Sequence, residues 1–528
     1  MMRLLLALLL LPLAGSARDI ALDALPREVR DALEKRFPGA RIVAADLDRV
    51  GTDGKPRTEV TYELTCLLPD REIEVLVTAD GRVLDEEFKV RPFRGRGEIP
   101  LSRDAVREDL ALFRTALEDR FAYLDYGEVA LAPLLKELDR EMSRSELALG
   151  LQKVMARFLD GHAEVSGLPE GRSFLPFLVE ATQGRFVAFL PDRAGFLEEG
   201  FPWIESIDGR PMQAWVDGLA AVVPGGSVSY RTRQTLRWLR ALDVCRTILG
   251  DRARDGVEIV LSDGTRRKPM RLTPADRPPI YGSWPRGRAP SLEGPVGYLP
   301  LAKMDADAAR LVREWMPRFK DAPGLIVDVR GNGGGTRDAL LALHPWLADL
   351  RVASVAKHRL AFPRGHLDAR FMAPADDPRL SEQERDAATT FLESFRPEWD
   401  PPAAKFSAWH LLLIPGGAAG DRYAGKVVVL MDDRCFSATD IFLGALKGLP
   451  RVTLVGRASG GGSGFAQRFT LPRSGIEIRC ASMASFTPDG RLYDLSGIEP
   501  DVAVDPSPAY FVVGGEDEIL RRARELLR

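Results

Sequence analysis

Two apolar runs in the C-terminal half of the chain predict buried strands. The run Val427–Met431 predicts one strand, and apolar residues spaced three and four apart from Ala438 to Leu446 predict a helix after it. Leu325–Val327, together with Val329, predicts the other strand. Each strand ends in a turn that contains residues of chemical interest.

The segment before these strands predicts a β-α-β unit. Gly297–Leu301 forms its expected first strand and Ala306–Met316 its crossover helix, which Pro317 is expected to stop. The strand at Leu325 is then expected to run parallel to the first. Further strands are predicted at residues 452–456, 467–471 and 475–481.

Upstream of this region the periodicity changes more than once. A short helix and strands at 58–66 and 72–78 come first, helical spacing begins at Ser102, and strand patterns with a helical segment at 231–248 follow. The predicted regions of the chain after its first 17 residues are 18–95, 100–170, 171–285, 295–505 with a polar and proline-rich insertion at 351–420, and a C-terminal helix at 506–528.

Composition and charge narrow the class of protein. The chain has 528 residues, of which 45% are apolar and 28% charged, as expected of a soluble globular protein with several domains. Its 73 Lys and Arg residues nearly balance 76 Asp and Glu residues, for a net charge of −3. This balance gives no indication of nucleic acid or an acidic membrane as a partner.

Residues 1–17 have the composition of an export signal. A positive charge precedes the apolar run from Leu4 to Leu13, and Gly15 and Ala17 are small residues at the positions that a signal peptidase reads. The run is shorter than the roughly 20 residues of a membrane-spanning helix. We expect cleavage after Ala17 and export of a soluble protein to the periplasm or the extracellular space.

The cysteines and histidines give no metal pattern. The chain contains the cysteines Cys66, Cys245, Cys435 and Cys480. Disulfides and free buried thiols both remain open for an exported chain. The cysteine spacing fits no zinc pattern, and His358, His366 and His410 are too scattered for a site. No metal and no other cofactor is expected.

Ser437 lies at the junction between the strand at 427–431 and the next helix. The N–H groups of a first helical turn carry partial positive charge and can stabilise an oxyanion, although a simple helix N-cap is the alternative interpretation. Earlier in the chain, the turn Arg330–Gly335 ends in three consecutive glycines that can approach a ligand closely. No Gly-Lys-Ser/Thr follows, so the turn is not a phosphate loop.

In combination, these two stretches resemble the signature of the C-terminal processing peptidases, also called tail-specific proteases, and of their tricorn-type relatives. The matching residues are Asp328–Gly335 and Ser437–Asp440 within residues 295–505. The resemblance implies a multidomain α/β fold with a ClpP/crotonase-like β-α-β catalytic core. It also implies that Ser437 is the nucleophile of a serine peptidase.

The other regions resemble known modules more loosely. Residues 18–95 are similar to small α+β PepSY-like modules, and 100–170 to the helical bundle that precedes the core in tricorn-type members. Residues 171–285 resemble a PDZ domain around Ile204–Met212, which implies peptide capture by strand addition. The insertion at 351–420 is interpreted as a surface lid or an oligomer contact.

The resemblance implies a general base as well. The processing peptidases proper place a lysine in a glycine-rich turn after the serine, but Gly460–Gly464 contains none. The remaining arrangement within the family is Ser/His/acid, in which His162 of the element Asp160-Gly161-His162 takes the role of base. A histidine that interacts with a helix C-terminus is the alternative. Gly161 departs from the serine that tricorn-type members often have there.

An acid and an oxyanion hole complete the implied site. Asp494 stands where tricorn-like proteins place the acid that orients the imidazole, and Glu499 is the second candidate. The oxyanion is expected to bind the N–H of Ala438 and one N–H from Gly333 or Gly334.

The sequence therefore predicts an exported serine endopeptidase that acts on peptides or unfolded proteins. A catalytically inactive peptide- or ligand-binding protein is the alternative, since the same fold occurs in retinoid-binding repeats without proteolysis. An esterase is a third interpretation, although no Gly-x-Ser-x-Gly elbow is present. An oligomer is compatible with the sequence, which does not define its size.

Overall fold

The computed structural model describes residues 22–37, 40–50, 56–67, 72–81, 83–89, 100–285, 287–361 and 372–528. The chain divides into two compact units, Met1–Glu98 and Ile99–Arg528. The expected export signal and its cleavage site after Ala17 lie outside the described residues.

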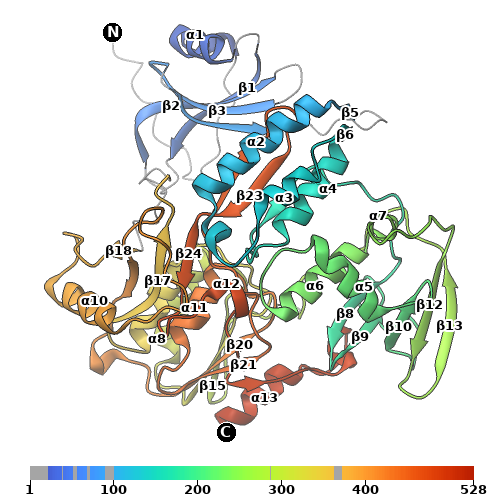
Figure 1. The fold of residues 1–528 in the computed structure, drawn as a ribbon. Coiled ribbons are helices and arrows are strands. Elements are labelled where there is room, and N and C mark those ends of the chain that lie inside the picture. The colour runs from blue at the N-terminus through green and yellow to red at the C-terminus, as the bar shows by residue number, and fades with distance from the viewer. Residues whose placement is uncertain are drawn as a thin grey trace, which may run out of the picture. The chain divides into compact units, whose positions relative to one another are not determined.

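The first unit is a helix with an antiparallel sheet. Its elements are η1 (Leu22–Ala24), α1 (Arg27–Arg36), β1 (Arg41–Val50), β2 (Pro56–Leu67), β3 (Glu72–Thr78) and β4 (Val83–Lys89), and the strands pair in the order β1–β2–β3–β4 (Figure 1). Val29 and Leu33 of α1 share a core with Leu64, Val75 and Val77 of the sheet. The two strands predicted at 58–66 and 72–78 fall within β2 and β3.

The second unit is built around a mostly parallel sheet. Its strands pair in the order β14–β15–β16–β20–β21–β25, with β14 antiparallel to β15 and the others parallel. Their bounds are β14 (Ser291–Glu293), β15 (Val296–Pro300), β16 (Gly324–Asp328), β20 (Lys426–Met431), β21 (Val452–Gly456) and β25 (Val502–Ala503). The parallel pairing of β15 with β16 is the one that the β-α-β pattern predicts.

Both faces of this sheet are covered, which explains why its central strands are apolar throughout. Val327 and Val429 face a core that they share with helices α8 (Ala306–Phe319), α9 (Asp338–Leu343) and α11 (Ala438–Leu446). Ile326 and Val428 face the opposite side, where α13 (Glu518–Leu527) covers the sheet (Figure 1). A 3-10 turn, η7 (Pro508–Phe511), precedes α13.

The prediction that Pro317 stops the crossover helix is wrong. Helix α8 continues through Pro317 to Phe319. Pro317 removes the one intrahelical hydrogen bond that its N–H would donate to residue 313, but Met316 and Phe319 are both fully buried in the core. Burial of this last turn therefore outweighs the cost of the proline.

Helices and short strands lead into the core. They are β5 (Pro100–Leu101), α2 (Arg103–Arg120), η2 (Ala122–Asp125), α3 (Leu131–Lys136), β6 (Met142–Ser143) and α4 (Arg144–Met155). Ser143 and Glu146 form a capping box at the start of α4. This helix ends at Met155, and residues 160–163 form a turn that continues into strand β7 (Glu164–Val165).

A second antiparallel sheet follows, with helices beside it. Its order is β13–β12–β10–β9–β8, formed by β8 (Leu178–Thr182), β9 (Arg185–Phe189), β10 (Trp203–Ile207), β12 (Val257–Ser262) and β13 (Arg267–Leu272), with β11 (Arg210–Pro211) paired to β10. The helical elements are α5 (Met212–Leu219), η3 (Ala220–Val222), α6 (Val228–Leu239) and α7 (Leu242–Ile248). The single helix predicted at 231–248 is broken at Arg240, whose carbonyl accepts the N–H of Leu175.

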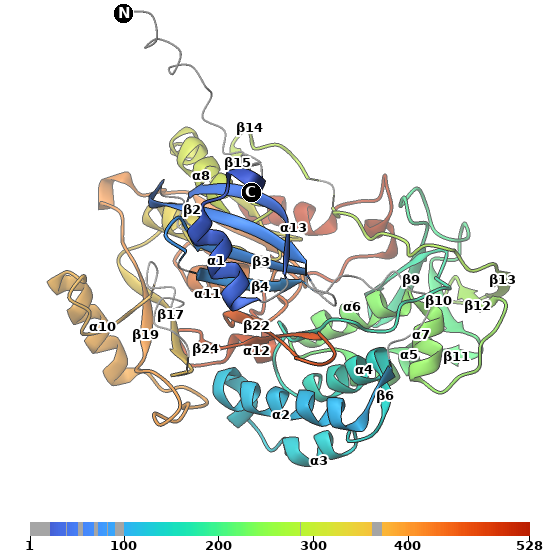
Figure 2. The ribbon, with the colours of Figure 1, turned by 90° about the horizontal axis from the view of Figure 1, so that it is seen from above.

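The insertion forms ordered structure in its described residues. It contributes β17 (Arg351–His358), β18 (Ala373–Pro374), α10 (Glu382–Ser394) and β19 (His410–Ile414), and a sheet forms in the order β18–β19–β17–β24 with β24 (Met483–Phe486). Within the second unit, α10 and β13 lie at opposite ends in both views (Figures 1 and 2). The remaining elements are η4 (His344–Trp346), η6 (Ala419–Asp421), β22 (Ala466–Thr470), β23 (Glu477–Ala481) and α12 (Tyr493–Ser496). His366 lies outside the described residues.

Candidate active site

Ser437 occupies a strained turn between β20 and α11. Its φ is 59° and its ψ is −120°, and its side chain makes no capping hydrogen bond. Backbone conformations of this kind cost a non-glycine residue about 1–3 kcal/mol and concentrate at functional sites. The N-cap interpretation therefore does not account for Ser437, whose hydroxyl is available for chemistry.

The glycine turn is joined to the Ser437 turn through Asn332. The Asn332 carbonyl accepts the N–H of Phe436 at 3.1 Å, and its side-chain oxygen accepts the Thr439 hydroxyl at 2.8 Å. The Asn332 amide donates to the carbonyl of Leu301 at 2.8 Å. Because Asn332 is fully buried, these bonds fix the glycine turn against the first turn of α11.

Two backbone N–H groups at this junction are available to an oxyanion. The N–H of Gly334 donates to the Asn332 side chain at 2.9 Å, so it is already used. Within the described part of the chain, the N–H groups of Gly333 and Ala438 have no hydrogen-bond acceptor. A Cβ built on Gly333 would meet nothing within 4 Å, whereas one on Gly334 would lie 2.8 Å from the Ser437 Cβ.

Asp440 ties the helix to the glycine loop that follows β21. Its carboxylate accepts the Ser459 hydroxyl at 2.5 Å and the N–H groups of Gly461 and Gly462 at 3.1 Å each. Burial raises the pKa of Asp440 to about 7, against the opposing effect of these donors. The acidic residue of the nucleophile motif thus has a structural role.

His162 reaches the same place from the N-terminal side. The β7 strand pairs with β23, which holds the loop after α4 against the core. The imidazole of His162 packs on the ring of Phe436, the neighbour of Ser437, with 4.7 Å between ring centroids. A Cβ at Gly161 would lie 2.9 Å from that ring. Because α4 ends well before it, His162 is not a helix-capping histidine.

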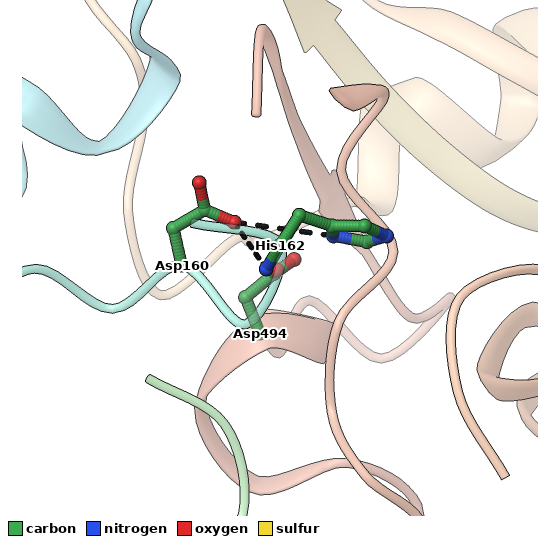
Figure 3. Close-up of side chains that lie close together, drawn as sticks. All are labelled: Asp160, His162 and Asp494. Atoms are coloured by element: carbon green, nitrogen blue, oxygen red, sulfur yellow. Dashed lines mark hydrogen bonds and ion pairs between the residues drawn. The ribbon is translucent and has the colours of Figure 1, made fainter. Parts of the chain in front are cut away.

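Two buried carboxylates lie beside His162 (Figure 3). Nδ1 of His162 is 3.9 Å from Oδ1 of Asp160, and the nearest side-chain ligand atoms of Asp160, His162 and Asp494 all lie within 4.8 Å of one another. Asp160 accepts the backbone N–H of His162 at 2.8 Å and that of Ala481 at 2.7 Å. Figure 3 shows Nδ1 on the side of the acids, so Nε2 is directed away from them.

Asp494 has one oxygen engaged and one without a partner. Its Oδ2 accepts the Tyr123 hydroxyl at 2.7 Å and the N–H of Ser463 at 3.2 Å. Its Oδ1 and the His162 Nδ1 are both buried and without a hydrogen-bond partner among the described residues. Buried polar atoms are rarely left unpaired, so both atoms keep unused hydrogen-bonding capacity at this place.

The burial of this cluster shifts its proton equilibria. Desolvation lowers the pKa of His162 to about 3 and raises the pKa of Asp160 to about 6. Burial and the nearby Asp160 charge raise the pKa of Asp494 well above its usual range. The imidazole is therefore neutral near pH 7, the form that a general base requires.

The structure places the two acid candidates, Asp494 and Glu499, in different environments. The Glu499 side chain is exposed, and the described acidic groups clustered with His162 are Asp160 and Asp494. The backbone carbonyl of Glu499 accepts a hydrogen bond from the Lys447 ammonium. Asp160, expected only as part of the histidine element, is a further buried acid beside His162.

Asp160, His162 and Asp494 also have the spacing of a metal site, but few free ligand atoms. Both oxygens of Asp160 and one of Asp494 accept hydrogen bonds, which leaves Oδ1 of Asp494 and Nδ1 of His162. Two free atoms fall short of the three protein ligands that even a catalytic zinc site uses. The cluster fits a base and its acids better than a metal.

The cysteines take no part in this site. Cys66, Cys245, Cys435 and Cys480 are all buried free thiols. The Cys435 thiol donates to the carbonyl of Val329 at 3.1 Å, and burial raises its pKa well above the ordinary value. A fully buried, hydrogen-bonded thiol with a raised pKa is not suited to act as a nucleophile.

The parallel sheet, the glycine turn and the serine turn together define a serine-type peptidase. Residues 295–504 match peptidase family S41. This match covers the parallel strands of the central sheet, the glycine turn and the Ser437 turn, and it supports a serine-type peptidase of the tail-specific kind.

Solved structures of CPAF share the fold over most of both chains. Mature CPAF complexed with lactacystin matches with 18% identity and a TM-score of 0.57, over 80% of this chain and 98% of that chain. Mature CPAF matches with 17% identity and a TM-score of 0.57, over 80% of this chain and 97% of that chain. A CPAF mutant matches with 17% identity and a TM-score of 0.55, over 80% of this chain and 96% of that chain. At these identities the similarity establishes the fold.

Among the residues that the structure describes, no helix combines the length and the apolar character that crossing a membrane requires.

Proposed function

We propose that the chain is an exported serine endopeptidase, with Ser437 as nucleophile and His162 as general base. The observation that carries the proposal is the 4.7 Å contact between the His162 and Phe436 rings. This contact brings the imidazole beside the strained Ser437 turn, although the two residues come from distant parts of the sequence. No other described histidine has such a contact.

In the proposed reaction, the Ser437 hydroxyl attacks the carbonyl carbon of a peptide bond while His162 takes its proton. The imidazolium returns that proton to the leaving amine. Water, deprotonated by the same imidazole, then hydrolyses the acyl-enzyme and frees Ser437. The N–H groups of Gly333 and Ala438 hold the oxyanion in both steps, and loss of one such donor typically costs about 10²–10³ in rate.

Asp494 is the proposed orienting acid, with Asp160 beside it. An imidazole whose pKa is about 3 accepts a proton weakly, so it needs a negative charge next to Nδ1 when the imidazolium forms. Burial raises the pKa of Asp494 well above its usual range, so the negative charge comes from Asp160, whose pKa is about 6 and whose Oδ1 lies 3.9 Å from Nδ1. Asp494 offers its unpaired Oδ1 as a hydrogen-bond acceptor for the Nδ1 proton, which leaves Nε2 free for Ser437.

Labelling with a fluorophosphonate tests the nucleophile and the base. We expect the mature protein to be labelled, Ser437→Ala to abolish labelling, and His162→Ala to slow it by at least about 100-fold. Ser496→Ala is the matched control, because its exposed hydroxyl bonds only to the next carbonyl. Lactacystin, with which the CPAF structure is complexed, serves as a second probe of Ser437.

The alternatives give different results in the same experiment. Labelling that survives Ser437→Ala would place the nucleophile elsewhere. A folded protein that binds peptides but is neither labelled nor cleaves them would be a binding protein on this fold. Turnover of small esters without any peptide cleavage would make it an esterase.

Export and the accessory regions belong to the same proposal. Residues 1–17 direct export, so the N-terminus of the mature protein from a periplasmic or culture fraction is expected at Arg18. The sheet formed by β8–β13 is proposed as a PDZ-like site that adds a peptide strand, and residues 18–95 as a PepSY-like accessory module. An unprocessed N-terminus would contradict export.

A further inference from the structure

A cavity of about 360 Å³ opens beside the proposed oxyanion hole. Gly333 and Phe436 contribute to its wall next to the Ser437 turn. The opposite wall is one face of α6, and the residues of that face that line the cavity are Tyr230, Arg233, Gln234 and Arg237. The cavity is thus placed to receive a substrate side chain close to the scissile bond.

Basic side chains dominate the charge of this wall. The charged residues that line the cavity are Arg233, Arg237, Arg330, Arg434 and Asp328. A cleft lined mainly by one sign of charge attracts ligands of the opposite sign. Whether these arginines are available depends on their existing partners.

Three of the arginines are already paired with acids. Arg330 binds both Asp328, at 2.6 Å, and Asp517, at 2.7 Å. Arg434 binds Asp432 at 2.8 Å. Arg233 lies 3.5 Å from Asp433 and is the most loosely held of the three.

Arg237 is different, because no acidic partner within ion-pair distance is found for it among the described residues. It is half-buried, and its guanidinium lies 5.8 Å from the centre of the Tyr281 ring. Desolvation and the neighbouring Arg233 lower its pKa, against the opposing effect of Glu180, which is not within ion-pair distance. Gln234 offers an amide on the same helical face.

We propose that this cavity is a subsite for an acidic substrate side chain, with the Arg237 guanidinium as the counter-ion of the Asp or Glu carboxylate. The inference rests on the proposed function, since it assigns specificity to the same site. A planar guanidinium matches a carboxylate in two parallel hydrogen bonds, which a glutamine side chain cannot satisfy in the same way. The subsite therefore distinguishes charge as well as size.

A matched set of peptides tests the subsite. A peptide library first identifies a cleaved sequence, and one position next to the scissile bond is then varied among Glu, Gln and Lys. We expect kcat/KM for the Glu peptide to exceed that for the Gln peptide about 10-fold or more, and the Lys peptide to be poorest. Each peptide is prepared with a free and with an amidated C-terminus.

Variants of α6 locate the effect. Arg237→Ala is expected to bring the ratio of kcat/KM for the Glu peptide to that for the Gln peptide close to one. Arg237→Glu is expected to make the Lys peptide the best of the three substrates. Arg231→Ala is the matched control, because Arg231 lies on the same helix outside the cavity wall. It is expected to retain the full ratio.

Two outcomes would overturn the subsite. Equal cleavage of the Glu and Gln peptides by the unmodified protein would remove the basis of the inference. A preference that disappears on amidation would mean that the cavity binds the C-terminal carboxylate of the peptide. Fluorophosphonate labelling of Ser437, which needs no acidic side chain, is measured in parallel, so loss of the subsite is distinguished from failure of the proposed catalytic function.

Discussion

The close approach of the glycine turn to Ser437 gives a direct test of the oxyanion arrangement. Gly334 has a φ of +105°, and a Cβ there would lie 2.7 Å from the Phe436 carbonyl oxygen and 2.8 Å from the Ser437 Cβ. In Gly334→Ala the left-handed backbone costs about 1–2 kcal/mol. Overpacking against backbone atoms adds about 1–3 kcal/mol.

The expected result is loss of activity that exceeds the loss of stability. The added methyl group separates the glycine turn from the Ser437 turn, which displaces the Gly333 N–H from the oxyanion position. We expect unfolding by denaturant to show a loss of about 2–5 kcal/mol, the sum of the two terms. Labelling of the folded fraction is expected to slow by about 10²–10³.

Gly331→Ala is the control for backbone strain. Gly331 also has a positive φ, +77°, but a Cβ there would meet only the Trp284 carbonyl, at 4.0 Å. It should lose stability through strain while it retains most of the labelling rate. Wild-type labelling in a folded Gly334→Ala protein, or equal loss of rate in both variants, would refute the assigned role of the glycine turn.

Three further predictions concern the residues around His162 and the thiols. Asp494→Asn should slow labelling at least about 100-fold, because an amide can present N–H groups where the imidazolium Nδ1–H needs an acceptor. The exposed Glu499→Gln should label normally, and equal rates for the two variants would contradict the role of Asp494. Burial raises the pKa of Asp160 to about 6, so the labelling rate should rise with pH through about 6 as its carboxylate becomes charged, and Asp160→Asn should remove that step from the pH profile. The stability linked to Asp160 is present below pH 3.8 and is lost as the pH rises through about 6, which adds a decline in unfolding free energy over that range. The thiols should react with a disulfide reagent only after unfolding, and Cys435→Ser should still be labelled, since all the cysteines are free and buried.

The catalytic strands were predictable because their burial on both faces leaves an unbroken apolar signal. Val427–Met431 and Leu325–Val327 show this pattern, and both lie in the central sheet. The continuation of α8 through Pro317 was not predictable from local propensity, because it depends on the burial of Phe319 in the core. Local sequence patterns therefore predicted secondary structure correctly where tertiary packing favours the same structure.

The acids beside His162 were harder to predict from the sequence than the strands of the central sheet. Asp494 and Glu499 stand close together in the chain, and only the packing of Tyr123 and Ser463 around one of them separates the two. Asp160 adjoins the histidine element, but its role depends on the N–H of Ala481, which comes from a remote strand. Contacts between distant segments leave no periodic signal.

The departure at Gly161 has a physical explanation in the ring of Phe436. A Cβ at Gly161 would lie 2.9 Å from this ring, and Cβ atoms at Gly460 and Gly462 would lie 2.8 and 2.2 Å from it. Glycines from two remote loops thus make room for one aromatic side chain, which stacks on Tyr230 with 4.8 Å between ring centroids and also contacts His162. Because Phe436 directly precedes Ser437, its packing fixes the nucleophile turn relative to the proposed base. A serine at 161 would compete with this ring for space, which supports the proposal of a base positioned by an aromatic contact and buried acids.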